Sequence, residues 1–555
     1  MNNRYIYLSF IFLIAGALSC KKVLNVTPYS SFTDATAFTT VDRIELAIAG
    51  VYDAAQSGFY PEGLAPRGYP FGSANIEQSD CRGEDMVNME TFYQATYNST
   101  YVSNSPNCTN MWNNCYALIN KANLTIEGVQ GALTGNVINQ QQEKSYEAEC
   151  RFLKAMAMHE LLIQFARPFA EGQGNQPGVI IRDFAIKDDA TIAQAGGEGR
   201  SSVADCYKAI ESDLDFAEAN LPETRGTLSS VRATKAAAIA LKMRVFLHEQ
   251  KWSDVIVSGS KLVNSNGPSF ISPIGKWTLT ATPDGPFKDN KSVESIFSIE
   301  NSNVDNSSVS GAMQSMYGSN GSDVGARGLI GISPIVYNLA EWDLTDLRRS
   351  QLITPNFTGG NPATAPSGKK PMLFTTKYRD KAWGDYAPQI RYAEVLLMLA
   401  EAYARQSSTV DTKALALLNA VRNRAVTTVS KQYTAASFAT ANALIKAILA
   451  ERRIEFIGEG KRWPDIHRLA LDPEFNNSKL AGNTTATIGG IPAKFNPASI
   501  TAANFNTIYS GTASYSSIPK TFAALPYSDY HFIWPLPQNE ITQSVNNVVT
   551  QNPNY

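Results

Sequence analysis

Hydrophobic positions recur at helical spacing along most of the chain. In RYAEVLLMLAEAYAR, residues 391–405, the charged residues fall on one narrow stripe and nearly all others are apolar or small. That pattern predicts a helix that is buried on most sides. The same periodicity predicts a first helix ending near Ala55 and further helices, at about 111–129, 146–165, 203–220, 231–249, 252–264, 390–406, 412–425 and 441–457. Several are joined by short links, so the pattern favours a mainly α fold built from helix pairs.

One neighbouring pair has a recognisable pattern. The Ala-rich stretch 233–263 resembles a tetratricopeptide helix pair, with Trp252 near the turn between the two helices. The match is partial, because Val255 stands where that pattern usually has Ala. We therefore expect tetratricopeptide-type pairs as the helical framework.

Long stretches without helical periodicity separate the helices, at about 58–107, 166–202, 265–385 and 471–533. Irregular segments of this length are uncommon in compact domains and are often functional. Within the third stretch, SVESIFSIEN (292–301) alternates β-branched and polar residues and predicts a short strand. We therefore expect a loop-rich second subdomain with few short strands.

Composition and the N-terminal segment narrow the function classes. The 555 residues carry a formal net charge of −2, and no basic run is present, so a nucleic-acid partner is not expected. Residues 1–19 read as a signal peptide, because their apolar run is too short to span a membrane and ends in small residues. Ala-Leu-Ser-Cys predicts that Cys20 is acylated and anchors the mature chain, 20–555, to a membrane. The alternative is an ordinary signal peptide with an incidental cysteine.

The remaining cysteines predict no metal site. They are odd in number and form no C-x-x-C pair, and lie at Cys81, Cys108, Cys115, Cys150 and Cys206. Export permits disulfides. Cys108 and Cys115 are close enough in sequence to pair, and the pairing is left open.

The segment ERRIEFIGEGKRWPDIHRLA (451–470) poses a choice between a phosphate loop and a structural turn. A phosphate loop needs a glycine five residues before Gly460 and a hydroxyl residue after Lys461, but Glu455 and Arg462 stand there. We therefore predict a helix that ends at Gly458, followed by a turn. An ion-pair cluster is expected to fix this turn, formed by Arg452, Arg453, Glu455, Arg462 and Asp465.

Other catalytic signatures are absent from the sequence. The four histidines form no H-x-x-x-H pair, and no G-x-S-x-G elbow occurs. A pair of carboxylates for glycoside hydrolysis is defined by geometry, so sequence leaves it open. We expect no catalytic residue, no cofactor and no metal ligand set, while calcium in a loop stays open.

Several of these segments together resemble the SusD/RagB-like outer-membrane nutrient-binding lipoproteins. They include Cys20, RFLKAMAMHELLIQFARP (151–168), RYAEVLLMLAEAYAR, ALLNAVRNRA (416–425), 451–469, FIWPLPQNEI (532–541) and the terminal QNPNY. The resemblance covers essentially the whole chain. It implies a SusD-like fold, no catalysis, and a lipid-anchored, surface-exposed place on the outer membrane. It also implies oligosaccharide binding, or peptide binding in some branches, with a SusC-like TonB-dependent transporter as partner.

The resemblance places ligand contacts in the first long loop and in a loop from the middle of the chain. A sugar site needs flat apolar faces beside polar groups for the hydroxyls. The residues predicted to bind ligand are Asp80, Arg82, Tyr93, Tyr97, Tyr101 and Tyr317, with each tyrosine equally able to serve as a packing residue. Starch is doubtful, because no Trp occurs between Phe59 and Asn110.

Two other classes of function are compatible with the residues. One is a surface glycoside hydrolase, and the other is a helical scaffold that binds peptides or another protein. Release of reducing sugar from polysaccharides by the purified protein would indicate the hydrolase. Binding to the transporter without binding of any glycan or peptide would indicate the scaffold.

Overall fold

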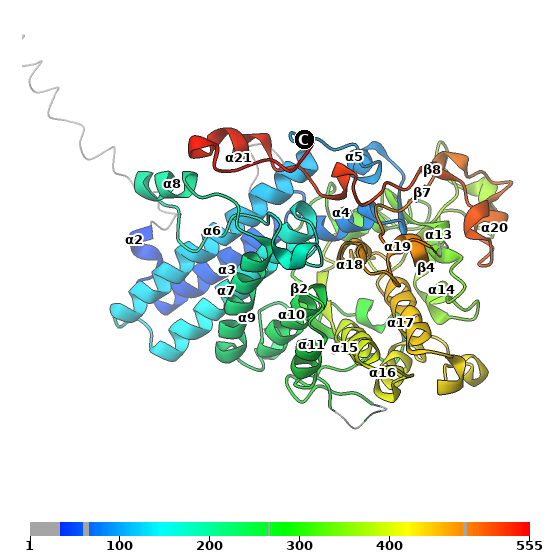
Figure 1. Ribbon diagram of the computed structural model, residues 1–555, viewed down its shortest axis with the longest axis horizontal. Helices are drawn as coiled ribbons and strands as arrows, with labels where there is room; N and C mark the ends of the chain where they lie inside the picture. Colours follow the sequence, from blue (N-terminus) through cyan, green and yellow to red (C-terminus); the bar gives the residue numbers. More distant parts are fainter. Residues whose placement is uncertain (1–33, 59–65, 265–266, 268, 481–484) are drawn as a thin grey trace, which may run out of the picture.

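The computed structural model describes residues 34–58, 66–264, 267, 269–480 and 485–555. The predicted signal peptide and Cys20 lie outside the described residues. Figure 1 shows the long N-terminal helices on one side of the molecule, and most of the short strands and loops of the C-terminal half on the other.

Long helices form the frame. They are α3 (Val41–Gln56), α6 (Pro106–Thr134), α7 (Gln140–Phe165), α9 (Val203–Asn220), α10 (Lys235–His248), α11 (Trp252–Gly259), α15 (Tyr392–Gln406), α16 (Thr412–Arg422), α17 (Ala441–Glu455) and α18 (Arg462–Leu469). From α3 to α16 each of these helices packs against the next, and α17 packs against α15. This confirms the mainly α fold with helix pairing of the tetratricopeptide type.

Side-chain caps explain where several helices begin. The side chain of Asn139 accepts a hydrogen bond from the amide of Gln142, and the amide of Asn139 donates to Oε1 of Gln142, so α7 starts with a capping box. Thr234 accepts from the amide of Ala237 at the start of α10. The predicted helix at 390–406 is corrected, because Ala387–Arg391 is strand β6 and α15 begins only at Tyr392.

Shorter helices occupy much of what the sequence predicts as irregular. They are α2 (Asp34–Ala37), α4 (Ala74–Arg82), α5 (Gln94–Tyr97), α8 (Asp189–Gly196), α12 (Met313–Tyr317), α13 (Pro334–Tyr337), α14 (Leu347–Gln351), α19 (Asn477–Leu480), α20 (Phe505–Ile508) and α21 (Gln538–Gln543). The stretch 58–107 therefore contains α4, α5 and the first turn of α6. Among the helices that the structure describes, none is both long and apolar enough to cross a membrane.

Strands in the described residues pair two by two, all antiparallel. The pairs are β1 (Met86–Asn88) with β3 (Ile330–Ile332), β2 (Ser295–Ile299) with β6 (Ala387–Arg391), β4 (Ile353–Pro355) with β5 (Leu373–Thr375), and β7 (Lys494–Phe495) with β8 (Lys520–Phe522). Strand β2 is the strand predicted within 292–301. Pairs such as β1 with β3 join segments far apart in sequence, so they fix the loops to the helical frame.

The five cysteines in the described residues are buried and free. Cys108 and Cys115 both lie on α6, seven residues apart. At 1.5 Å of rise per residue their backbones are about 10 Å apart, too far for a disulfide. The pairing that the sequence leaves open is therefore excluded for these two.

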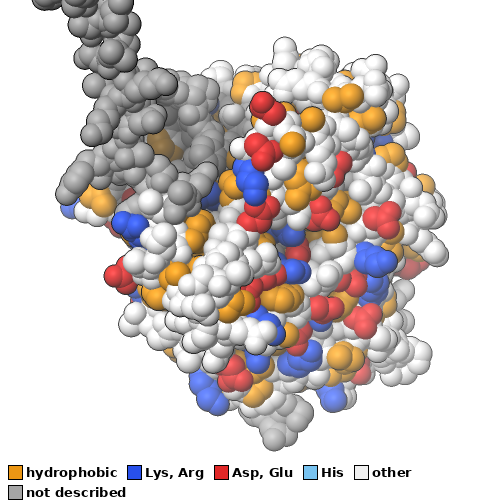
Figure 2. All heavy atoms as spheres, turned by 90° about the vertical axis from the view of Figure 1, so that its left-hand side faces the viewer, with side chains coloured by type: hydrophobic (Ala, Val, Ile, Leu, Met, Phe, Trp, Pro, Cys, Tyr) orange, Lys and Arg blue, Asp and Glu red, His pale blue; other side chains and the backbone are white. Residues whose placement is uncertain are grey.

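Positive and negative side chains alternate over the face shown in Figure 2, which is the left-hand side of Figure 1. Such mixing agrees with the net charge of −2. A nucleic-acid partner would favour a continuous basic stripe, and this face gives no support for one.

Candidate functional site

The turn after α17 has the structural role that the sequence predicts. Gly458 and Gly460 have φ of 74° and 70°, in the left-handed region that glycine adopts without strain. A Cβ on Gly460 would lie 2.6 Å from the Cα of Ile76 in α4. The turn therefore needs glycine both for its backbone angle and for its close approach to α4.

The ion pairs around this turn have partners that sequence spacing does not show. Arg452 bonds Asp465 at 2.9 Å, as expected. Burial would raise the pKa of Asp465, but the charges of Arg452 and Arg468 outweigh it and lower the pKa. Arg462 instead bonds Glu84, with its Nε 3.0 Å from Oε2. The predicted cluster is therefore correct for Arg452 and Asp465, while the other members reach distant elements.

Glu455 lies at the centre of a wholly buried charge network. Its carboxylate lies 3.1 Å from Nη2 of Arg391, 2.6 Å from Nη2 of Arg424 and 3.0 Å from Nη1 of Arg348. Arg391 also pairs with Glu459, at 2.7 Å, and with Glu294. Arg391 does not pair with Glu394, three residues along, because Arg391 is in β6 and Glu394 bonds Arg244, at 2.7 Å.

Asp80 and Arg82, two of the predicted ligand residues, are interior side chains of α4 and each is 2% exposed. The Asp80 carboxylate accepts hydrogen bonds from the hydroxyl of Tyr317 at 2.7 Å and from the amide of Gly460 at 3.0 Å. The Arg82 guanidinium lies 3.7 Å from the ring centroid of Trp463 and donates to the carbonyl of Phe532 at 2.8 Å. Both residues therefore join α4 to segments far along the chain.

The four predicted tyrosines are also buried, between 0% and 3% exposed. The hydroxyl of Tyr97 donates to the carbonyl of Phe495 at 2.8 Å, and that of Tyr101 donates to the carbonyl of His531. Tyr93 donates to Glu77, and Tyr317 to Asp80. The expectation of open ring faces is wrong for this conformation, so stacking on a sugar by these rings stays a prediction that their burial does not support.

Asp80 gives a pH prediction. Burial raises the pKa of Asp80 to about 8, against the hydrogen bonds from Tyr317 and Gly460, which lower it. The folded protein therefore keeps this carboxyl protonated up to about pH 8, whereas the unfolded chain releases the proton near pH ~3.9. Its contribution to stability is full below pH ~4 and is lost as pH rises towards 8. Asp80→Asn should remove this loss. The melting temperature of the wild type minus that of Asp80→Asn should therefore decrease between pH 5 and pH 8. An unchanged difference would contradict the assignment.

Aromatic residues that sequence reasoning missed are partly exposed on the loops around α12. Trp383 lies in the loop between β5 and β6 and has φ of 65°. Positive φ is a true outlier for a bulky residue, and such strain is concentrated at functional sites. No hydropathy signal marks this position, because the strain is visible only in the backbone.

Trp383 adjoins an unsatisfied polar group. The Oε1 atom of Gln314 and the indole Nε1 of Trp383 are both buried and have no hydrogen-bond partner. They lie 3.7 and 3.6 Å from the point that a Cβ on Gly325 would occupy. A buried unpaired donor or acceptor costs free energy, and a group that both donates and accepts, as a hydroxyl does, would satisfy both atoms.

A second aromatic ring, that of Phe92, lies near the segment that follows α12. Arg67 and Arg327 lie over Phe92, 5.6 and 6.0 Å from its ring centroid, and Phe92 is partly exposed. Asp323 pairs with Arg379, at 3.3 Å. We call Phe92, Gln314, Asp323, Arg379 and Trp383 the loop face. Phe92, Arg379 and Trp383 are at least partly exposed, so it combines ring surface with an open guanidinium, whereas Gln314 is 1% exposed and the side chain of Asp323 is 6% exposed. Among the described residues, no group of three or more His, Cys, Asp or Glu side chains is arranged to hold a metal ion.

Comparison with known proteins agrees with this architecture. Residues 344–555 match the model of the SusD family, and residues 26–247 match a model described as starch-binding associating with outer membrane. SusD-like protein P38 of Formosa agariphila is 24% identical over 83% of this chain and 91% of its own. A SusD superfamily protein from Bacteroides thetaiotaomicron superposes with a TM-score of 0.70 at 21% identity, over 93% of this chain and 100% of that one. A laminarin binding SusD-like protein superposes with a TM-score of 0.62 at 18% identity, over 93% and 100%.

A helical-repeat frame that carries irregular loops and short strand pairs defines the SusD class of fold. The chain belongs to the SusD/RagB family.

Proposed function

We propose that this protein is a cell-surface lipoprotein that captures oligosaccharides and passes them to a SusC-like TonB-dependent outer-membrane transporter. The observation that carries the proposal is Trp383, a strained and partly exposed aromatic residue beside the unpaired amide oxygen of Gln314. Membership of a family that includes a starch-binding description and a laminarin-binding neighbour supports the same ligand class.

The loop face suits reversible sugar capture. An indole offers a flat apolar surface to the C–H groups of a pyranose, and the exposed guanidinium of Arg379, which Asp323 holds in place, offers hydrogen bonds to its hydroxyls. Asp323 is held by the amide of Ser319, 3.0 Å from its Oδ2. A site on loops that a rigid frame positions loses less conformational entropy on binding.

Binding without catalysis is part of the proposal. A glycosidase needs one carboxyl kept protonated near neutral pH and a second carboxylate across the same cleft. Glu77 and Asp80 have pKa values raised by burial, but both side chains are enclosed in the core. Their oxygens accept hydrogen bonds inside the protein, from the hydroxyls of Tyr93 and Tyr317.

Acylation of Cys20 is the second element of the proposal. Cys20→Ala should leave the precursor unprocessed or release the protein from the membrane fraction, because two or more acyl chains are needed for stable anchoring. Fractionation and mass spectrometry of the mature N-terminus measure this. A mature chain with an unmodified N-terminus at another residue would show that the anchor is absent.

Transfer to a transporter is tested by isolating the tagged protein from its native outer membrane. We expect a TonB-dependent transporter to co-purify, and deletion of this chain to slow growth on the glycan that it binds. If the protein were isolated without a transporter, and the deletion strain grew on that glycan as well as the parent, transfer to a transporter would be contradicted.

A further inference from the structure

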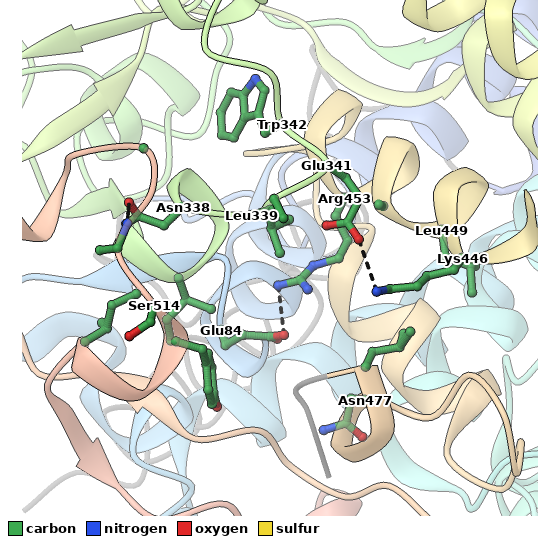
Figure 3. A pocket seen from close by; sticks show the side chains of 18 of the residues that line it. Glu84, Asn338, Leu339, Glu341, Trp342, Lys446, Leu449, Arg453, Asn477 and Ser514 are labelled. Atoms are coloured by element: carbon green, nitrogen blue, oxygen red, sulfur yellow. Dashed lines mark hydrogen bonds and ion pairs between the residues drawn. The ribbon is translucent and has the colours of Figure 1, made fainter. Parts of the chain in front are cut away.

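A hollow of about 650 Å³ opens beside α17, away from the elements that form the loop face. It lies between α17, α18, the segment after α13 and the loop 511–518, and we call it the α17 hollow (Figure 3). Sites for small molecules typically have volumes of ~300–1,000 Å³. The α17 hollow is therefore large enough to take one such ligand.

The walls of the α17 hollow are largely apolar. Leu339 and Leu449, labelled in Figure 3, line it, as do Ile335, Ile518 and Tyr515. Tyr515 is 37% exposed, so part of its ring is open to a ligand. Apolar walls of this kind favour a ligand with an aryl or aliphatic body.

Charges at the floor are already neutralised. Arg453 Nη2 lies 3.0 Å from Glu84 Oε1, and Arg462 donates to the same carboxylate. Burial would raise the pKa of Glu84, but the charges of Arg462 and Arg453 outweigh it and lower the pKa to about 2. The floor therefore stays an internally paired salt bridge at neutral pH and offers no free charge to a ligand.

Charges at the rim are paired as well. Lys446 lies 3.3 Å from Glu341, and Lys431 lies 3.4 Å from Asp343; Figure 3 draws the first of these contacts. An anionic ligand would have to displace a carboxylate to reach Lys446, and a cationic ligand would have to displace the lysine. Both lysine side chains are more than half exposed, so solvent screens these pairs and they disfavour a charged ligand only modestly.

We infer that the α17 hollow is a second binding site, for an uncharged ligand with an apolar body and hydroxyl groups at one end. A neutral sugar that carries an aryl or acyl substituent has this chemistry. The substituent would lie against Leu339, Leu449 and Tyr515, and the hydroxyls would face the polar rim. The inference rests on the hollow alone and does not require the loop face to bind glycan.

The test is a titration followed by NMR or calorimetry, with phenyl β-glucoside as the neutral probe and phenyl β-glucuronide as its anionic counterpart. We expect saturable binding of the glucoside, and binding of the glucuronide weaker by roughly two- to fivefold. Equal or tighter binding of the glucuronide, or no binding of either probe, would overturn the inference.

A matched pair of variants locates the binding. Ser514 lines the α17 hollow at its exposed edge, whereas Ser516, two residues along the same loop, does not. Ser514→Trp should fill the opening and abolish glucoside binding, while Ser516→Trp should leave it unchanged. Both positions are exposed, so the melting temperature should be the same in all three proteins. Equal binding by both variants would place the ligand elsewhere.

A third variant tests the charge argument. Glu341→Gln frees Lys446, so glucuronide binding should become equal to or tighter than glucoside binding. Unchanged discrimination would show that the rim pairs do not select the ligand. Trp383→Ala should leave glucoside binding at the α17 hollow intact, which keeps this test separate from that of the proposed function.

Discussion

Arg391→Ala should lower the free energy of unfolding by ~3–5 kcal/mol. Arg391 is 3% exposed and pairs with Glu294, Glu455 and Glu459. Its removal takes one cationic partner from each of these carboxylates, although Glu294 keeps Arg424 and Glu459 keeps Lys377, each at 2.6 Å. The buried network is then left with excess negative charge, whose desolvation cost is no longer offset. Urea or thermal unfolding of the purified variant measures the loss.

Lys369→Ala is the control for Arg391→Ala. Lys369 pairs with Glu90, and both side chains are more than a third exposed. A surface pair of this kind is worth only ~0–1 kcal/mol, because solvent screens it. If both substitutions shifted the unfolding midpoint equally, the buried network would have no special part in stability.

Trp383→Ala should weaken glycan binding by roughly 1–3 kcal/mol, by analogy with the stacking of flat ligands on aromatic rings. The partly exposed indole is expected to be the main apolar surface of the loop face. Its removal should leave the melting temperature nearly unchanged, because the indole is only partly buried and alanine keeps the same Cβ at this positive φ. Isothermal titration with a glycan found by screening gives the affinity.

Tyr101→Phe is the comparison for Trp383→Ala. Tyr101 is 1% exposed and its hydroxyl bonds the carbonyl of His531, so loss of the hydroxyl should reduce stability and leave glycan affinity unchanged. The reverse outcome, with affinity lost in Tyr101→Phe and kept in Trp383→Ala, would return the site to the segment 80–101.

Helical periodicity predicts the frame well, because most long helices bury one continuous apolar stripe. The bounds of α9, Val203–Asn220, are those that the spacing predicts. The start of α15 is missed, because the apolar run continues without a break from β6 into the helix. A buried strand and a buried helix look alike over so few residues.

Helix α4 shows where hydropathy fails. Its sequence, ANIEQSDCR, is polar, yet nearly every residue in it is buried. The polar groups are satisfied by partners far along the chain, such as Gln164, whose Oε1 lies 2.7 Å from Nη1 of Arg82. Partners that are distant in sequence give no local hydropathy pattern. From the sequence alone, Asp80 and Arg82 are therefore interpreted as surface side chains that contact ligand.

The loop face could not be derived from spacing for a related reason. Phe92, Gln314 and Trp383 lie on three separate segments, which the pairings of β1 with β3 and of β2 with β6 help to hold in place. The resemblance to a family indicates the middle of the chain, but Tyr317 is enclosed and Trp383 is the partly exposed aromatic. Only the three-dimensional structure distinguishes an aromatic ring that is buried in the core from one that is exposed to a ligand.

The most direct test of the central claim is a titration of the purified mature chain against a panel of neutral and charged polysaccharides, with reducing ends assayed in the same samples. We predict saturable binding to at least one glycan and no increase in reducing ends over many hours. Release of reducing ends would identify an enzyme, and absence of binding across the whole panel would contradict glycan capture.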